Sequence, residues 1–369
     1  MSFDAARLAN AATAALRAYD PGHDLPALRR LHGAALAELG SNENPLGPSP
    51  VALAAARDSL AEAFRYPDPK GAALKRAIAG HLGVAASRIA LGNGSHELLM
   101  LIGQCFADMR SSVVHSQYGF AVFPIATAAA GARMIRVPAL PADHARMPYG
   151  HDLPAIAAAV EADTRIVFLA NPNNPTGGWF DDAALDALLD RVPATTLVVV
   201  DEAYQEFVDD TGPRSALRLI DRHPNLIVTR TFSKAYALAG LRVGYLIADP
   251  GVVDVIERLR ESFNVNGPAL AAAEAALGDA EHLRRVRDWT LDERAWLAGE
   301  LSARGYRVLP SQTNFLLIDL GEDAVALEAA LFARAVIVRP MTGYGLPQTL
   351  RISVGSRDEN LRLLAALPR

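Results

Sequence analysis

LIVTRTFSKAYALAGLRVGYLIA, residues 226–248, is the stretch that decides the fold. It contains two short apolar runs, 226–229 and 244–248, and between them a more polar segment that carries Lys234 and Arg242. Short, nearly continuous apolar runs bounded by polar residues are typical of strands that are buried on both faces of a sheet. The stretch therefore predicts two buried strands, with chemically reactive side chains beyond the end of the first.

Five further runs of this kind precede it in the chain. They lie at 88–91, 113–115, 134–137, 165–170 and 196–200. Helical patterns separate them, and apolar runs that alternate with amphipathic stretches indicate parallel strands covered by helices. We therefore expect an α/β fold whose large domain, residues 45–267, is built on a mostly parallel seven-stranded sheet flanked by helices.

The pattern changes after residue 267. A long helical region, 269–304, precedes four short runs at 306–309, 314–319, 336–338 and 350–354. We expect these elements to form a smaller C-terminal α+β domain, residues 268–369. Residues 1–44 are expected to be an N-terminal arm or part of that small domain, and the turn formers at 42–48 (NENPLGP) predict an irregular loop.

Composition excludes several classes of protein. A length of 369 residues allows roughly two domains, and 51% hydrophobic residues exclude a disordered chain. The net charge of −5 (36 basic minus 41 acidic residues) indicates neither a nucleic-acid nor a membrane partner. Cys105 is the single cysteine, and the N-terminus does not read as a signal peptide. We expect a soluble, cytoplasmic protein.

Four predicted strand ends carry polar residues that a core does not require. They are followed by 92–97 (GNGSHE), 171–178 (NPNNPTGG), 201–204 (DEAY) and 230–234 (RTFSK). Ligands bind beyond the carboxyl ends of the strands in an open parallel sheet. One crevice is therefore expected to hold an amine, a carboxylate, a phenol, an amide and an anion-binding turn.

That set of groups matches the needs of pyridoxal phosphate, which requires a lysine, a carboxylate for its ring nitrogen and a phosphate cradle. Lys234 has small and apolar neighbours, which favour its neutral, nucleophilic form. Asp201 supplies the carboxylate, and Ser95 opens a helix whose first amides, Gly94 to His96, predict an anion site. Further phosphate donors are expected to be Thr231, Ser233 and Arg242.

The same segments carry a family resemblance. The order NPNNPTG (171–177), DEAY (201–204) and TFSKAYALAGLR (231–242) resembles the fold-type I pyridoxal-phosphate-dependent transferases, within them the class-II aminotransferases. Together with NENP (42–45), RYP (65–67) and LRISVG (350–355), the chain is similar to the histidinol-phosphate aminotransferases. The resemblance extends from Tyr19 to the C-terminus.

The resemblance implies reversible transamination between L-histidinol phosphate and 2-oxoglutarate, giving imidazole acetol phosphate and L-glutamate, in L-histidine biosynthesis. It implies a covalent Schiff base between pyridoxal 5'-phosphate and Lys234, with Asp201 on the ring nitrogen. Asn174 and Tyr204 would hydrogen-bond the ring hydroxyl, and Tyr118 would stack on the ring. The residues expected around the cofactor phosphate are Gly94, Ser95, His96, Thr231, Ser233 and Arg242.

On the substrate side, the resemblance assigns Arg351 to the carboxylate of glutamate, as a bidentate fork. The residues expected to contact substrate are Tyr19, Asn44, Tyr66, Asn174, Arg339 and Arg351. Tyr66 would reach the neighbouring subunit's active site, which implies a homodimer. The histidines show no metal-ligand spacing, so no metal site is expected.

Other interpretations stay open at this point. Asp201 could cap a helix over 202–207, Tyr118 could belong to the core, and Arg339 and Arg351 could form surface ion pairs. His96 stands where relatives often carry an acidic residue, and 115–118 (HSQY) lacks the prolines often seen before the stacking tyrosine. For the whole protein, the alternatives are an aromatic amino-acid aminotransferase, a threonine-phosphate decarboxylase-like lyase and a non-catalytic cofactor-binding regulator.

Overall fold

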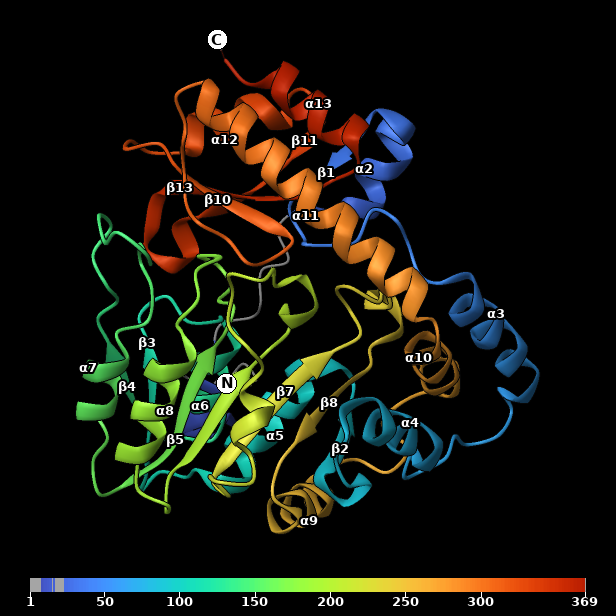
Figure 1. The fold of residues 1–369 in the computed structure, drawn as a ribbon, viewed down its shortest axis with the longest axis vertical. Helices are drawn as coiled ribbons and strands as arrows, with labels where there is room; N and C mark the ends of the chain where they lie inside the picture. Colours follow the sequence, from blue (N-terminus) through green and yellow to red (C-terminus); the bar gives the residue numbers. More distant parts are fainter. Residues whose placement is uncertain (1–7, 15, 17–22, 369) are drawn as a thin grey trace, which may run out of the picture.

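The computed structural model describes residues 8–14, 16 and 23–368. All seven apolar runs form strands of one sheet, whose order is β2-β8-β7-β6-β5-β3-β4 (Figure 1). The strands are β2 (Ile89–Gly92), β3 (Ser112–Ser116), β4 (Arg133–Val137), β5 (Thr164–Ala170), β6 (Leu197–Asp201), β7 (Leu226–Thr231) and β8 (Gly244–Ile247). The predicted mostly parallel seven-stranded sheet is confirmed.

One strand, β8, runs against the others. It pairs antiparallel with both β2 and β7, whereas every other pair in this sheet is parallel. The connection from β7 to β8 contains only a 3-10 turn at Ala239–Leu241, and it lacks the crossover helix that a parallel return usually needs. As a consequence Lys234 and Arg242, which lie on this connection, stay at one edge of the sheet.

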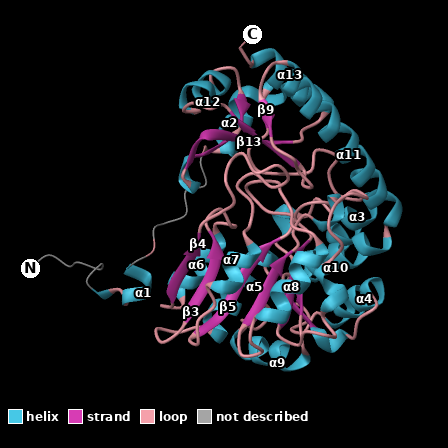
Figure 2. Ribbon diagram, turned by 60° about the vertical axis from the view of Figure 1, so that its left-hand side comes forward, coloured by secondary structure: helices cyan, strands magenta, loops and turns pink. Residues whose placement is uncertain are grey.

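Helices cover both faces of the sheet, so this part of the molecule has three layers (Figure 2). Val198 and Val200 enter the core cluster on one face of β6 while Val199 enters the cluster on the other. The first cluster includes residues of α3 (Pro50–Ser59), α4 (Ala72–Leu82), α7 (Leu153–Ala158), α8 (Asp182–Arg191) and α10 (Gly267–Gly278). The second includes residues of α5 (Gly94–Phe106), α6 (Val122–Ala129) and α9 (Pro250–Leu259).

A second, antiparallel sheet lies toward the C-terminus, with the order β12-β13-β10-β9. Its strands are β9 (Arg307–Val308), β10 (Phe315–Asp319), β12 (Arg339–Met341) and β13 (Leu346–Ser353). It packs with α11 (Ala280–Ala303), α12 (Val325–Phe332) and α13 (Arg357–Ala366) around a core of its own. A smaller α+β unit is therefore present, as the sequence predicts.

The helical region predicted at 269–304 is two helices. Asp279 follows α10 and caps α11, because its side chain accepts a hydrogen bond from the amide of His282 at 3.0 Å. α10 packs on α3 and α4, beside the larger sheet. The domain ranges 1–44, 45–267 and 268–369 stay a prediction, and these contacts favour a boundary after α10.

The N-terminal segment packs with the C-terminal α+β unit through a pair of short strands. After α1 (Ala11–Ala14) and α2 (Leu25–His32), the strand β1 (Ala37–Glu38) pairs in parallel with β11 (Val336–Ile337). The run 336–338 thus pairs with β1 and not within the four-stranded sheet. Residues 39–48 then cross irregularly toward α3, and they include the irregular loop predicted at 42–48. Within the part of the chain that the structure describes, no helix is long and apolar enough to cross a membrane.

Candidate active site

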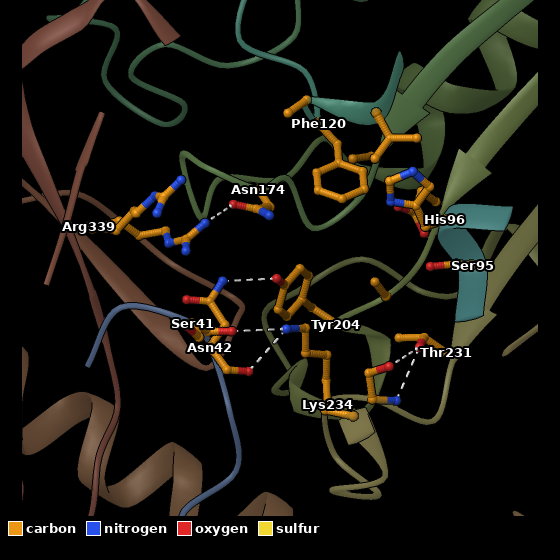
Figure 3. A pocket seen from close by; sticks show the side chains of 18 of the residues that line it. Ser41, Asn42, Ser95, His96, Phe120, Asn174, Tyr204, Thr231, Lys234 and Arg339 are labelled. Atoms are coloured by element: carbon orange, nitrogen blue, oxygen red, sulfur yellow. Dashed lines mark hydrogen bonds between the residues drawn. The ribbon is translucent and has the colours of Figure 1, made fainter. Parts of the chain in front are cut away.

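A cavity of about 510 Å³ lies where the parallel strands end. Ala170, Asp201 and Thr231, the last residues of β5, β6 and β7, line it on one side. The C-terminal sheet and residues 40–42 of the N-terminal segment close it on the other (Figure 3). The predicted site residues among its lining are Ser95, His96, Asn174, Asp201, Tyr204, Thr231, Ser233, Lys234, Arg242, Arg339 and Arg351.

The amine of Lys234 is held inside this cavity by main-chain oxygens. Its Nζ donates to the carbonyl oxygens of Ser41 and Asn42, each at 3.2 Å (Figure 3). Withdrawal from water lowers the pKa of Lys234 to about 8, and the positive charges of Arg351 and Arg242 act in the same direction. A large share of the amine is therefore neutral near pH 8, the form that a nucleophile requires.

Asp201 is the last residue of β6 and is buried. Its Oδ1 accepts a hydrogen bond from the hydroxyl of Thr229 at 2.9 Å. Burial raises the pKa of Asp201 to about 7, and the neighbouring carboxylate of Glu202 raises it as well. A cationic group in the cavity would reverse that shift, so this carboxyl is suited to pair with a protonated ring nitrogen. The helix-cap interpretation is not what the structure shows, since only the short turn Gln205–Phe207 follows.

One end of the cavity is suited to a phosphate. The helix α5 begins there without a side-chain cap, so its first amides are open to a ligand. Arg242 donates to the hydroxyl of Ser233 at 3.2 Å, and Thr231 donates to the same hydroxyl at 2.9 Å. The guanidinium of Arg242 passes close to Gly94, where a Cβ would lie 2.4 Å from Nη2. Gly94 therefore borders the phosphate end without lining the cavity.

His96 and Tyr204 are both kept neutral by their surroundings in the cavity. The pKa of His96 is lowered by burial and by the charge of Arg242, which favours a neutral imidazole. Tyr204 accepts a hydrogen bond from the amide of Asn42 at 3.0 Å, and burial raises its pKa to about 12. Tyr204 therefore stays a neutral phenol that can donate to a ligand.

Two arginines of the C-terminal sheet face the opposite end of the cavity. Arg351 donates to Oδ1 of Asn174 at 2.6 Å and to the carbonyl of Gly40 at 2.7 Å. Arg339 is its direct register partner across β12 and β13, so both side chains belong to one face of the sheet. Arg351 is buried and lies over the ring of Phe315 at 5.3 Å, which excludes the surface ion pair as its environment.

Several predicted residues lie elsewhere. Tyr118 packs edge-on against Tyr149, with ring centroids 5.7 Å apart, and does not line the cavity. Asn44 donates to the carbonyl of Ala235 at 2.9 Å, which ties the loop to the segment after Lys234. Tyr66 is exposed. Tyr19 lies outside the residues that the structure describes.

Two of the lining residues that sequence reasoning did not single out bear directly on the site, Phe120 and Asn42. Phe120 stands just before α6 and faces the cavity beside His96 (Figure 3). Asn42 adopts φ +55° and contacts both Tyr204 and Lys234. The signal for Asn42 was its place among turn formers, because asparagine tolerates positive φ. For Phe120 the signal was an aromatic residue only two positions after Tyr118.

Residues 35–367 match the family model described as aminotransferase class I and II. The chain belongs to that family. Among curated relatives of this aminotransferase, "Histidinol-phosphate aminotransferase 2" of Pseudomonas aeruginosa is 47% identical over 355 residues, which cover 95% of this chain and 94% of the relative. The protein of the same name from Pseudomonas fluorescens strain Pf-5 is 46% identical, covering 100% and 99%.

One solved structure is similar to this chain over nearly the whole length of both. The histidinol-phosphate aminotransferase of Sinorhizobium meliloti, crystallised with pyridoxal-5'-phosphate, superposes with a TM-score of 0.83 and 34% identity. The match covers 97% of this chain and 95% of that one. The fold-type I architecture and the aminotransferase class predicted from the sequence are confirmed.

The residues of the cavity fit pyridoxal phosphate. The open start of α5 beside Arg242 fits its phosphate, and the buried carboxyl of Asp201 fits its ring nitrogen. The amine of Lys234, whose pKa is lowered to about 8, lies in the same space. In the described part of the chain, no group of three or more His, Cys, Asp or Glu side chains is placed to hold a metal ion.

Proposed function

We propose that this aminotransferase moves an amino group between L-histidinol phosphate and 2-oxoglutarate, giving imidazole acetol phosphate and L-glutamate in L-histidine biosynthesis. The observation that carries the proposal is the pairing of Arg339 with Arg351 at the end of the cavity opposite α5. The two half-reactions bring a phosphate monoester and a carboxylate to the same place in turn. Planar guanidinium groups bind both anions in bidentate fashion.

We expect Lys234 to carry pyridoxal phosphate through a Schiff base. Once the cofactor is joined to the substrate amine instead, it would withdraw electrons from the α-carbon of that substrate. The chain supplies the remaining functions. Lys234, once displaced by the substrate amine, would be the base that moves a proton between the α-carbon of the substrate and the C4′ atom of the cofactor. Asp201 would keep the ring nitrogen protonated, and Tyr204 would donate to the ring hydroxyl from a phenol that does not ionise at neutral pH.

The walls of the cavity orient these groups. We assign to Phe120 the stacking position over the ring, because it faces the cavity where Tyr118 does not. The phosphate would be held by the first amides of α5 with Ser95, and by the side chains of Thr231, Ser233 and Arg242. Asn174 accepts from Arg351 at 2.6 Å, so it fixes the guanidinium that receives the substrate. His96 contributes its main-chain amide.

We further propose a homodimer in the cytoplasm, with Tyr66 reaching the partner's active site. The support is a group of exposed apolar side chains beside Tyr66, which is 82% exposed. Its ring stacks on Phe263 at 4.7 Å, and Phe64 is 76% exposed nearby in the chain. A monomer rarely leaves such a group in water.

The test is the visible spectrum of the protein loaded with pyridoxal phosphate, recorded before and after L-histidinol phosphate is added without keto acid. We expect the absorbance of the lysine-bound cofactor to fall and 2-oxoglutarate to restore it.

Phe120, Met341 and Tyr344 give the cavity an apolar wall that also suits an aromatic side chain. A spectrum that ignores histidinol phosphate but responds to phenylalanine would move the substrate to the aromatic amino acids.

A further inference from the structure

A second, smaller cavity of about 190 Å³ lies beside the active-site cavity. Its lining is His115, Gln117, Gly119, Ala121, Pro124, Arg136, Gly343 and Tyr344. Ala121 and Tyr344 also line the larger cavity. These two residues therefore form the wall between the two spaces, and Tyr344 supplies most of it because the side chain of Ala121 is a single methyl group.

Tyr344 is held in this position from both sides. It ends the 3-10 turn Thr342–Tyr344, which connects β12 to β13 in the C-terminal sheet. Its hydroxyl accepts a hydrogen bond from the amide of Ala121 at 3.2 Å, just before α6. Its ring packs in the apolar cluster that includes Met341 and Tyr149. The wall is thus a contact between the C-terminal sheet and the loop that carries Phe120.

The space behind Tyr344 differs in character from the cavity in front of it. Arg136, an exposed residue of the edge strand β4, lines it together with Gln117. His115 is 1% exposed, and its Nε2 has no hydrogen-bond partner among the described residues. Burial lowers the pKa of His115, so the imidazole is neutral. The mechanism proposed above uses none of these three residues.

We propose that Tyr344 limits the length of the amino substrate by separating the active-site cavity from this side cavity. The inference rests on the transamination proposed above. A substrate with a longer side chain meets the tyrosine ring in the intact protein. Without the ring, the two cavities join, and the far end of a longer side chain enters the space beside Gln117 and His115.

The experiment compares L-phenylalanine with L-homophenylalanine, which is one methylene longer, as amino donors to the protein loaded with pyridoxal phosphate. The measured quantity is the ratio of kcat/KM for the two donors. We expect Tyr344→Ala to raise the homophenylalanine:phenylalanine ratio by about tenfold, because a pocket that rejects one methylene discriminates by roughly 10- to 200-fold. Tyr344→Leu, which keeps bulk in the apolar cluster, should raise the ratio in the same direction if the alanine variant does not fold.

Two variants serve as controls. Tyr344→Phe keeps the ring and loses only the hydroxyl, so its ratio should stay within about twofold of the original protein. Thr342→Ala changes an exposed neighbour that lines neither cavity and should leave the ratio unchanged. An unchanged ratio in both Tyr344→Ala and Tyr344→Leu would overturn the proposal, and so would a ratio that rises equally in Tyr344→Phe. Failure of the proposed function would show differently, as an unmodified protein that does not respond to histidinol phosphate.

Discussion

The hydroxyl of Thr229 donates a hydrogen bond to Oδ1 of Asp201 across the β6–β7 pair, at 2.9 Å. Thr229 is 0% exposed and Asp201 is 4% exposed, so water does not compete for this bond. A donor to the carboxylate favours its charged form and opposes the effect of burial, which raises the pKa of Asp201 to about 7. Thr229 is therefore a positioning residue behind the proposed partner of the cofactor ring.

Thr229→Val should weaken cofactor binding. Valine has nearly the shape of threonine but no hydroxyl, so the pKa of Asp201 should rise further. A hydrogen bond to a charged group contributes about 1.5–3 kcal/mol, which corresponds to a loss of about tenfold or more in affinity. The measurement is a titration with pyridoxal phosphate from pH 6 to pH 9, with Thr229→Ser as the control that keeps the hydroxyl. Equal affinity for the valine and threonine proteins at every pH would remove the role assigned to Thr229.

Asp201→Asn should stabilise the cofactor-free protein at alkaline pH. The folded pKa of Asp201, about 7, lies above the ordinary value of 3.8. Its contribution to stability is therefore fully present below about pH 4 and is lost as the pH rises through about 7. Asparagine lacks this loss, so the variant should exceed the original protein by about 1–3 kcal/mol at pH 8, with the gap closing toward pH 4. Urea unfolding at both pH values measures the difference, and a less stable variant at pH 8 would contradict the environment described for Asp201.

The rate at which the cofactor-free protein takes up pyridoxal phosphate should depend on the charge of Lys234. Only the neutral amine attacks the aldehyde, and the pKa of Lys234 is about 8. The rate should rise about tenfold per pH unit from pH 6 and level off above about pH 8, well below the range of an ordinary lysine. Stopped-flow absorbance measures the rate. Lys234→Ala should show no such uptake and no transamination, whereas Lys70→Ala, at an exposed turn, should behave as the original protein.

Arg351→Ala should raise the KM for glutamate by about 100-fold, because it removes a buried bidentate partner of the substrate carboxylate. Arg351→Lys should recover only part of the loss, since an ammonium cannot reproduce the planar fork. Steady-state kinetics give KM and kcat separately. Arg304→Ala, at an ion pair with Glu300 on the surface of α11, is the matched control. A change in melting temperature without a change in KM would make Arg351 a structural residue.

Mixed dimers test the role of Tyr66. If each site takes Lys234 from one subunit and Tyr66 from the other, then refolding Lys234→Ala together with Tyr66→Ala restores one intact site per mixed dimer. Random pairing then gives about one quarter of the original activity. The control mixture is Lys234→Ala with Asp201→Asn. Each site takes Lys234 and Asp201 from the same subunit, so both sites of a mixed dimer are defective and no activity should be restored. An equal result for the two mixtures would place Tyr66 outside the partner's site.

The large sheet could be predicted because its strands are buried on both faces. A segment such as 196–200 then reads as a continuous apolar run, and its length separates it from a helix. The direction of β8 could not be predicted, since an apolar run carries no sign of direction. The strand β12 was missed because Pro340 lies within it, and proline argues against a strand in sequence.

The site residues could be predicted where a reactive side chain lies at the end of a strand or shortly after it. Asp201 ends β6 and Lys234 follows β7, so their order along the chain already places them at one edge of the sheet. Asn42 lies 162 residues from Tyr204, and only the folded chain brings them to 3.0 Å. Phe120 lines the cavity and Tyr118 does not, a difference that the sequence does not show because residue type alone does not indicate which of two neighbouring aromatic side chains faces a cavity.

The parallel pairing of β1 with β11 has a consequence for synthesis on the ribosome. Residue 37 emerges 299 positions before its partner, residue 336. At a translation rate of about 5–20 residues per second, the N-terminal strand waits roughly 15–60 s for that partner. The loop at 40–42, which holds the amine of Lys234, is anchored by two residues of β13 that emerge later still, Arg351 and Ser353. Lys234 therefore gains its main-chain acceptors only near the end of translation, long after the sheet that carries it can fold.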